Sequence, residues 1–498
     1  MTARRGGAHA APPGYLGAEA RVRSGPAPEL VAAGYELELA DAPLLHRGLG
    51  LADLAHVIAL AEGGAISSDD ARALLGALLE LHDGEPEIDD PRYGDLANVR
   101  ERTLEQRAGS AAGWLNAGRP RREAGRVAFR IALRERLLDL EAATLRFAAA
   151  LVALAERERD TPMPDYTYLQ VAQPTTVGHW VLSFAQPALR DADRLARDFA
   201  AANLSPAGAG GVNGSRFPLD RERLAGLLGF SAPIEHTRDA MWQTDPLTEA
   251  AWHAATAAMG ASRFAEDLEI YGSDEFALLA IDDAFCRASA LMPQKRNPYA
   301  LVVIRGGAGT LLGRATGVLA TQHTPSGRTD NLLYAYGEVC GAVELARRVV
   351  DLTAAVTETL RVDREACARA LDASAALAAD VAEVLSLECG LDYRSAYRVV
   401  GRAVADGALD ASGIERAARD VLGRPVTIDA ATLERALDPA QALAARVVTG
   451  GAAPAPMSAM LAGAHAAVEA ATAQVARDRD AITRAEAALV AQARAQAR

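Results

Sequence analysis

The stretch that decides the fold is residues 126–158, RVAFRIALRERLLDLEAATLRFAAALVALAERE. Val127, Ile131, Leu138 and Leu145 recur at spacings compatible with one face of a helix, while Arg, Glu and Asp occupy other faces. The stretch contains neither Pro nor Gly and exceeds the roughly 25 residues at which a periodic segment suggests a long bundle helix. It therefore predicts a helix bundle.

Similar long helical segments follow along the chain, although each contains at least one Gly. Runs rich in β-branched and aromatic residues with a period of two are scarce, so little sheet is expected. The sequence therefore predicts an all-α protein whose further long helices lie at 247–273, 298–321, 331–360 and 461–495.

Breaks in the pattern divide the chain. The first residues lack apolar periodicity, Gly118–Pro120 interrupts a helical region, and a charged segment lies near 361–366. We expect a flexible arm, a small helical domain, a central long-helix bundle and a C-terminal helical domain, at 1–28, 29–117, 118–362 and 363–498.

Composition narrows the class of protein. The 498 residues carry a net charge of −13 with no Lys/Arg stripe, which argues against nucleic-acid binding and against a polybasic membrane surface. No apolar run approaches the length of a membrane span. The four cysteines lie far apart without CxxC spacing: Cys286, Cys340, Cys367 and Cys389. We therefore expect neither a disulfide scaffold nor a Cys-based zinc site, and we expect a cytoplasmic protein.

The chain has 52 basic residues, and every one except Lys295 is arginine. A compact ammonium kept against this bias indicates a tight site that a planar guanidinium cannot fill, although chance survival of one surface lysine is the alternative. The neighbouring sequence, ASALMPQKRNP at 288–298, places a hydroxyl, a cation and an amide close enough to surround one carboxylate. The competing interpretation is a surface loop that caps a helix.

Residues 288–298 resemble the mobile-loop signature of the fumarase/aspartase superfamily, approximately GSSxMPxKxNP. The segment YTYLQVAQPTTVGH at 166–179 is similar to the YTHLQxAQP segment of argininosuccinate lyases, and NAGRPRRE at 116–123 is similar, more weakly, to their HTGRSRND segment. The three segments occur in the family's order, and the resemblance covers roughly residues 35–440.

This resemblance implies a homotetramer built on a twenty-helix core, with each active site assembled from three subunits. It also implies a small anionic substrate and no metal or organic cofactor. Members remove a proton from the carbon next to a carboxylate of a succinyl group and expel an amine or a hydroxyl, which yields fumarate. Because that proton is weakly acidic, the enzyme has to stabilise the doubly charged intermediate.

The resemblance also assigns roles residue by residue. Ser289 matches the catalytic base, which acts as a serine oxyanion, and Lys295 and Asn297 match residues that hold the carboxylate. The other matches are substrate contacts: Thr167 near the leaving group, Gln173 at the succinyl site and the carboxylate-binding Arg121.

Two departures from the family pattern affect one proton relay. Tyr168 stands where argininosuccinate lyases have a His, and Val302 stands where a Glu orients that His. Loss of both halves suggests that the relay was abandoned as a unit, because an orphan buried Glu is costly. Tyr168 either donates a proton to the leaving amine or is a packed replacement for the imidazole.

Further departures fall on the part of the site that faces the amine. Pro120 and Arg122 replace a Ser and an Asn, and SGRTD at 326–330, which includes Arg328, replaces a Tyr- and Asn-rich run. Two added cations repel a guanidino group and favour an amine that carries an extra carboxylate.

The sequence therefore predicts a C–N lyase that performs β-elimination on an N-substituted aspartate and releases fumarate and an amine other than arginine. One alternative is a true argininosuccinate lyase with a rebuilt proton relay. A second alternative is a non-catalytic paralogue, against which the retained Ser289, Thr167, Lys295 and Asn297 argue.

Three other features favour structural roles. His179 follows a Gly on an expected helix and is interpreted as a packing residue. The loop Gly208–Gly214 lacks the Lys-Ser/Thr ending of a phosphate cradle. The adjacent carboxylates Asp282 and Asp283 are expected to be solvated or to cap a helix rather than to bind a metal.

Overall fold

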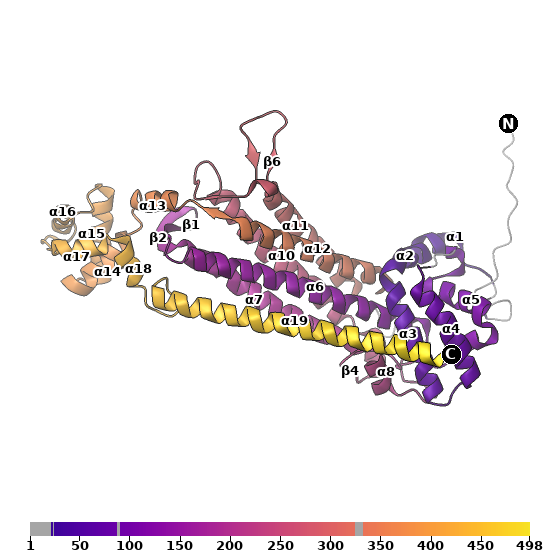
Figure 1. Cartoon of the computed structure of the whole chain (residues 1–498). Helices are drawn as coiled ribbons and strands as arrows, with labels where there is room; N and C mark the ends of the chain where they lie inside the picture. The colour runs from indigo at the N-terminus through magenta and orange to yellow at the C-terminus, as the bar shows by residue number, and fades with distance from the viewer. Residues whose placement is uncertain (1–20, 23, 87–89, 324–331) are drawn as a thin grey trace, which may run out of the picture.

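The computed structural model describes residues 21–22, 24–86, 90–323 and 332–498. It is an elongated helical molecule, and its middle is a bundle of long helices (Figure 1). The predicted fold class is confirmed, and each predicted long helix has a counterpart in this bundle: α6 (Arg121–Arg157), α10 (Asp245–Tyr271), α11 (Tyr299–Thr321), α12 (Leu333–Thr359) and α19 (Pro454–Gln496), joined by α7 (Val177–Ala202).

Helix α6 is the central member of the bundle and packs against α3, α7, α12 and α19. It begins directly after Pro120, whose extended backbone (φ −75°, ψ 153°) ends the preceding turn. At about 1.5 Å per residue its 37 residues span roughly 55 Å. The length of α6 therefore sets the distance between the residues at its start and those that follow its end.

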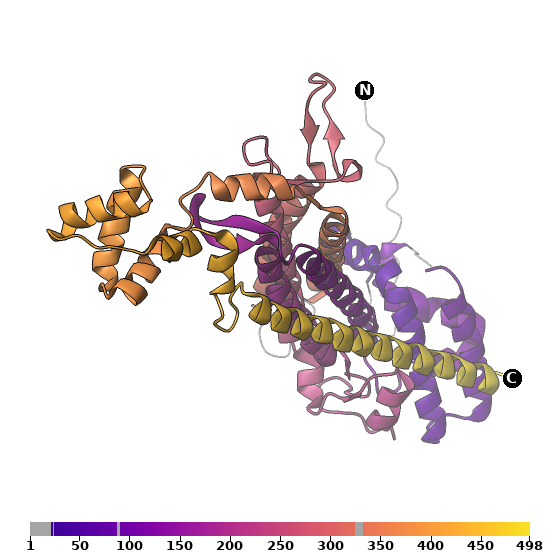
Figure 2. The ribbon, with the colours of Figure 1, turned by 60° about the vertical axis from the view of Figure 1, so that its left-hand side comes forward.

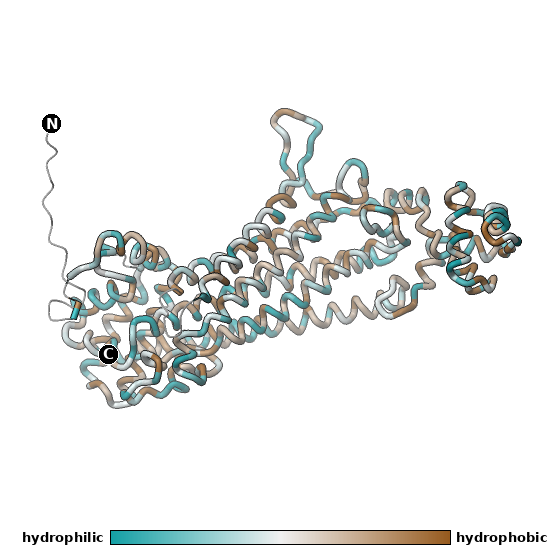
Figure 3. The backbone as a smooth tube through the Cα atoms, turned by 180° about the vertical axis from the view of Figure 1, so that it is seen from behind, coloured by the Kyte–Doolittle hydropathy of each residue, from teal (hydrophilic) through white to brown (hydrophobic). Residues whose placement is uncertain are grey.

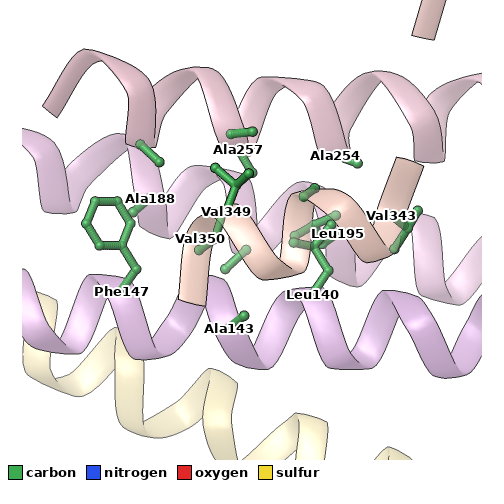
Figure 4. Packing of buried hydrophobic residues seen from close by; sticks show 14 of the residues in the cluster. Leu140, Ala143, Phe147, Ala188, Leu195, Ala254, Ala257, Val343, Val349 and Val350 are labelled. Carbon is green, nitrogen blue, oxygen red and sulfur yellow. The ribbon is translucent and has the colours of Figure 1, made fainter. Parts of the chain in front are cut away.

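The bundle core is made of small and large apolar side chains that interdigitate (Figure 4). Alanines on α7 and α10 let these helices approach α6 and α12 closely, so that leucine, valine and phenylalanine side chains fill the space between them. Truncating such a leucine to alanine typically costs about 2–5 kcal/mol. The labelled members, all buried, are Leu140, Ala143, Phe147, Ala188, Leu195, Ala254, Ala257, Val343, Val349 and Val350.

The N-terminal helices form a second core at one end of the bundle. They include α3 (Ala42–Glu62), α4 (Ser68–Asp83) and α5 (Leu96–Ala108), and the end of α19 packs into the same cluster, whereas Leu39 of α2 (Glu36–Ala40) belongs to the bundle core. Helix α3 is long and apolar enough to cross a membrane by length and composition, but 78% of its most apolar window is buried inside the molecule. Such burial is typical of a core helix.

At the other end, six shorter helices follow β8 (Arg361–Val362). Four of them share a small core of their own, and α19 then runs back along the bundle to the N-terminal helices (Figures 1 and 2). Hydrophilic and hydrophobic residues alternate along the long helices (Figure 3). The short helices are α13 (Arg364–Asp372), α14 (Ala378–Cys389), α15 (Tyr393–Ala405), α16 (Ala411–Leu422) and α17 (Ala430–Ala436), with α18 (Pro439–Ala444) leading into α19.

Strands are few in the described residues, as expected. The longest pair is the antiparallel hairpin of β1 (Pro162–Thr167) and β2 (Gln170–Thr176). Its two turn residues, Tyr168 and Leu169, have φ values of 54° and 56°, a left-handed conformation that suits a tight hairpin turn but is uncommon for residues other than Gly. The remaining pairs have two residues per strand: β3 (Leu204–Ser205) with β4 (Ala232–Pro233), β5 (Leu279–Ala280) with β8, and β6 (Arg287–Ala288) with β7 (Arg296–Asn297).

Candidate functional site

The segment that carries the single lysine is a hairpin that projects from the side of the bundle (Figures 1 and 2). Strands β6 and β7 pair at its base, with Arg287 opposite Asn297. Near its tip the backbone N–H of Lys295 donates to the carbonyl oxygen of Met292 at 3.1 Å. Lys295 is exposed and Ser289 is partly buried.

Ser289 is held by the backbone of its own loop. Its Oγ accepts hydrogen bonds from the N–H of Leu291 at 3.3 Å and of Met292 at 3.0 Å. Donors aimed at a hydroxyl oxygen favour its deprotonated form, because they stabilise the negative charge that deprotonation creates. The loop therefore supplies part of the environment that a serine oxyanion requires.

The base of the hairpin is fastened by polar contacts. Nδ2 of Asn297 donates to the carbonyl oxygen of Arg287 at 3.0 Å. Nε of Arg296 donates to Oδ1 of Asp283 at 2.5 Å, and its guanidinium also donates to the carbonyl oxygen of Ile281. Asp282 accepts from the N–H of Ala284 at the start of a short helix. Asp282 therefore caps a helix, one of the two roles expected for the adjacent carboxylates, whereas Asp283 pairs with Arg296.

The second motif forms the β1–β2 hairpin. Thr167 and Gln173 are exposed, and Tyr168 at the turn is 99% exposed. Tyr168 is thus not packed inside its own chain, and Val302, at the other position of the missing relay, is 57% exposed on α11. Both positions face outward.

His179 lies just behind this hairpin, in the first turn of α7. Its Nδ1 is 3.0 Å from Oγ1 of Thr175, and its Nε2 is 3.0 Å from the carbonyl oxygen of Gly450. With both ring nitrogens engaged, its interpretation as a packing residue is confirmed.

The third motif opens α6 and borders a pocket. Arg121 pairs with Asp95 at 3.2 Å, and Arg122 donates to both carboxylate oxygens of Glu38 at 2.8 and 3.2 Å. Burial raises the pKa of Glu38, although Arg122 acts in the opposite direction. The pocket is lined by Glu38, Asp41, Leu45, Leu49, Asp95, Leu96, Ala97, Arg121, Arg122, Gly125 and Tyr336.

This pairing changes one expectation. Arg122 was expected to add a cation that repels a guanidino group, but its charge is matched by Glu38. Arg122 therefore supplies no unmatched charge that would repel a guanidino group. The other expected cation, Arg328, lies outside the described residues, as does the whole segment 326–330.

Glu123, in the same motif, explains the glycine-rich loop. Its carboxylate is buried and accepts hydrogen bonds from the N–H groups of Gly208 and Gly210, both at 2.7 Å. Burial raises the pKa of Glu123 to about 7, against these hydrogen bonds. Because a carboxylate already occupies these amides, they are not offered to a phosphate group, in line with the structural interpretation.

The three motifs lie in three places within one chain. Arg121 begins α6, and the β1–β2 hairpin follows the far end of the same helix, roughly 55 Å away at 1.5 Å per residue. The hairpin with Ser289 projects from the bundle between these ends (Figure 1). A single chain thus brings Ser289, Lys295 and Asn297 together on one loop but leaves Thr167 and Arg121 apart from them.

Known proteins resemble this chain along most of its length. A family model described as lyase matches residues 94–313. The argininosuccinate lyase of Methanoculleus marisnigri is 35% identical over 418 residues, which cover 82% of this chain and 85% of that one. The argininosuccinate lyase of Haloarcula marismortui is 34% identical over 411 residues, with 81% of each chain covered. The chain belongs to the fumarase/aspartase superfamily, in its argininosuccinate lyase-like part.

Solved structures of this superfamily agree. EDDS lyase in complex with formate superposes with a TM-score of 0.84 at 25% identity and covers 95% of this chain and 96% of that one. A variant of EDDS lyase with bound fumarate matches equally well. A class II fumarase from Schistosoma mansoni, at 16% identity and a TM-score of 0.68, shares the fold. As a superfamily member, the chain is a fumarate-forming lyase.

Sequence reasoning missed the acidic partners of the site arginines. Glu38 and Asp95 stand in no quoted motif, and only the folded chain places them beside Arg122 and Arg121. Asp283 was noted in the sequence, but not as the partner of Arg296. Glu123 stood in the quoted motif without an assigned role. In the described part of the chain, no group of three or more His, Cys, Asp or Glu side chains is placed to hold a metal ion.

Proposed function

We propose that this chain is a carbon–nitrogen lyase that cleaves an N-substituted aspartate into fumarate and an amine. The observation that carries the proposal is Ser289, whose Oγ accepts two backbone N–H groups on the loop that also presents Lys295. Amide donors and a nearby ammonium are what a serine hydroxyl requires to act as an oxyanion base.

In this reaction the Ser289 oxyanion takes the proton from the carbon next to the carboxylate, so that a C–H bond breaks and an O–H bond forms. The released electron pair moves onto the carboxylate, where Lys295 and Asn297 stabilise the doubly charged intermediate. Collapse of the intermediate forms the C=C bond of fumarate and breaks the C–N bond. The amine leaves as it accepts a proton, and we assign Tyr168 as the donor because its hydroxyl is free of contacts with its own core.

We further propose that the active form is a homotetramer whose sites are shared between chains. The distance between Arg121 and Thr167 along α6 supports this, because no single chain of this shape brings both to Ser289. Exposed apolar residues on α11, among them Val302, Leu312 and Leu319, supply a surface for neighbouring copies.

We propose that the amine is not arginine and that it carries a carboxylate. The absence of the His–Glu relay, with Tyr168 and Val302 in its place, and the loss of a hydroxyl at Pro120 support a site rebuilt around a different leaving group. The likeness to EDDS lyase over 95% of the chain is consistent with this reading. The identity of 35% to argininosuccinate lyases favours the second candidate, argininosuccinate lyase itself.

The deciding experiment follows fumarate absorbance with argininosuccinate, EDDS and a panel of N-substituted aspartates. We expect a carboxylate-bearing member of the panel to react fastest. Cleavage of argininosuccinate at a rate matching or exceeding every other compound would establish the second candidate. Release of fumarate from none of them would favour a non-catalytic paralogue.

A further inference from the structure

The carboxylate of Glu158 joins the end of α6 to the base of the β1–β2 hairpin. Glu158 follows the last residue of α6 and is only 4% exposed. Its Oε2 accepts a hydrogen bond from Oγ1 of Thr161 at 2.8 Å, and Thr161 directly precedes β1. The N–H of Val177, which directly follows β2, donates to the carbonyl oxygen of Thr161 at 2.9 Å. One buried carboxylate therefore holds the residue that joins the bases of both strands.

The start of α7 closes against the same corner of the fold. The N–H of Gly178 donates to the carbonyl oxygen of Glu158 at 3.0 Å. A Cβ atom added to Gly178 would lie 2.4 Å from the carbonyl oxygen of Ala155 and 2.7 Å from Cα of Arg159, so the backbones of α6 and α7 touch here. Because the packing leaves no free space, a shift of Glu158 is passed on to the strands instead of being absorbed locally.

The cation that pairs with Glu158 through two of its nitrogens comes from the C-terminal helices. Nε of Arg364 donates to Oε2 of Glu158 at 2.9 Å, and Nη2 donates to Oε1 at 3.4 Å, the forked geometry that suits a carboxylate. Nε of Arg157 adds a contact to Oε1 at 3.2 Å. Burial acts to raise the pKa of Glu158, but hydrogen bonds from Arg364, Thr161 and Arg157 lower it below its ordinary value. The carboxylate is therefore ionised at neutral pH and binds Arg364 as an anion.

Arg364 approaches Glu158 from a fixed position although its side chain is 62% exposed. It is the first residue of α13 and follows β8, which pairs with β5. The N–H of Asp363 donates to the carbonyl oxygen of Leu278 at 2.9 Å, and α13 packs against β1 (Figure 1). The pair thus ties the base of the hairpin to a helix whose own start is fastened to the bundle.

The far end of the hairpin depends on this base. Thr167 ends β1, and Tyr168 at the turn is 99% exposed. The side chain of Tyr168 therefore gains no support from the core of its own chain, and its place in space is set by the strands that carry it. A displacement of about 1 Å at a reacting group is enough to lower a rate by orders of magnitude.

We propose that Arg364 is a positioning residue of the reaction, which acts through Glu158 to hold the β1–β2 hairpin with Thr167 and Tyr168 at the leaving amine. This inference rests on the proposed function and goes beyond it, because it assigns the orientation of the leaving-group side of the site to the first residue of a C-terminal helix. Arg364 itself touches no substrate in this proposal.

The kinetic test compares three variants with the wild type. Arg364→Gln removes the charge, Arg364→Lys keeps it, and the control Arg369→Gln breaks an exposed pair with Glu365 on the same helix. With the panel compound that reacts fastest, we expect Arg364→Gln to lower kcat roughly tenfold. Arg364→Lys should restore part of this loss, and Arg369→Gln should match the wild type.

A double-mutant cycle separates positioning from a loss of folded protein. Tyr168→Phe removes the assigned proton donor, and with it the group that Arg364 is proposed to position. We therefore expect Arg364→Gln to lower kcat less than about twofold in the Tyr168→Phe background. A loss of folded enzyme would instead lower the rate by the same factor in both backgrounds.

Hydrogen–deuterium exchange tests the same contact without turnover. Peptides that cover residues 162–176 report on the hairpin. We expect these peptides to exchange faster in Arg364→Gln than in the wild type, because the base of the hairpin opens more often. Arg364→Lys and Arg369→Gln should keep exchange close to that of the wild type.

The outcomes separate this inference from the proposed function. If the hairpin exchanges faster in Arg364→Gln but no compound of the panel releases fumarate, the proposed reaction fails and the hold of Arg364 on the hairpin stands. If fumarate is released but Arg364→Gln turns over like Arg369→Gln, or lowers kcat equally in both backgrounds, the inference is overturned and the reaction stands. Unchanged exchange over residues 162–176 also overturns the inference.

Discussion

The Oγ atom of Ser289 lies 3.0 Å from the backbone nitrogen of Met292, whose N–H donates to it. The same backbone turn continues to Lys295, whose N–H donates to the carbonyl oxygen of Met292. The candidate base and the single lysine of the chain are therefore fixed relative to one another by one short piece of backbone. This geometry makes the first two predictions specific.

Ser289→Ala should lower turnover at least a hundredfold while leaving folding and assembly intact. The change removes the proton acceptor, and the flanking residues Ala288 and Ala290 offer no replacement. Fumarate release and size-exclusion chromatography check the two halves of the prediction. Ser67→Ala, which removes a comparable hydrogen bond at the start of α4, is the matched control and should keep full activity. Retention of more than a few per cent of the rate by Ser289→Ala would contradict the assignment.

Lys295→Arg should be nearly as damaging as Lys295→Ala. In the shared site that we propose, a compact ammonium binds the carboxylate, and a planar guanidinium does not fit the same space with the same three donors. Steady-state kinetics on both variants measure this. If Lys295→Arg bound and turned over substrate normally, the residue would be an ordinary surface lysine.

The pairing of Arg296 with Asp283 should position the catalytic hairpin. Both side chains are largely exposed, so breaking the pair by Arg296→Gln should change the melting temperature little. We expect kcat/KM to fall severalfold, because the base of the loop loses its anchor. Arg72→Gln breaks an exposed pair with Asp69 on α4 and serves as the control. Equal activity of the two variants would show that the hairpin does not depend on this contact.

Mixed tetramers should recover activity that neither parent has. Ser289→Ala and Thr167→Val chains, each inactive alone, place an intact Ser289 and an intact Thr167 in one site when they assemble together. Helix α6 places Thr167 far from Arg121, and the shared site that we propose would bring such residues together from different chains. Activity is measured after refolding of equimolar mixtures whose mixed composition is verified by mass spectrometry. No recovery in such tetramers would rule out shared sites.

Stability should depend on pH through Glu123. Its pKa in the folded chain is raised from 4.5 to about 7, chiefly by burial, so the folded state holds a proton that the unfolded state has released between these values. The contribution of Glu123 to the free energy of unfolding is therefore complete below about pH 4.5 and is lost as the pH rises through about 7. The loss amounts to roughly 3 kcal/mol at most. Melting curves from pH 5 to 8 should fall more steeply for the wild type than for Glu123→Gln. Parallel curves would contradict this assignment.

Local sequence was sufficient for the long helices and for the three motifs. Apolar periodicity reports on one helix at a time, and the bounds of α6 extend the stretch 126–158 by five residues at its start. The motif with Lys295 is likewise contiguous, so its Ser, Lys and Asn had to share one loop. Within such segments the backbone itself enforces proximity.

Contacts between segments far apart in the sequence could be identified only from the tertiary structure. Arg122 and Glu38 are 84 residues apart, and their pairing turned an expected free cation into a matched one. That Nε and Nη2 of Arg126 have no hydrogen-bond partner among the described residues is equally invisible in the sequence, because it depends on everything packed around this side chain. Periodicity and motifs are properties of neighbouring residues, whereas burial and charge compensation are set by how helices far apart in the chain pack together.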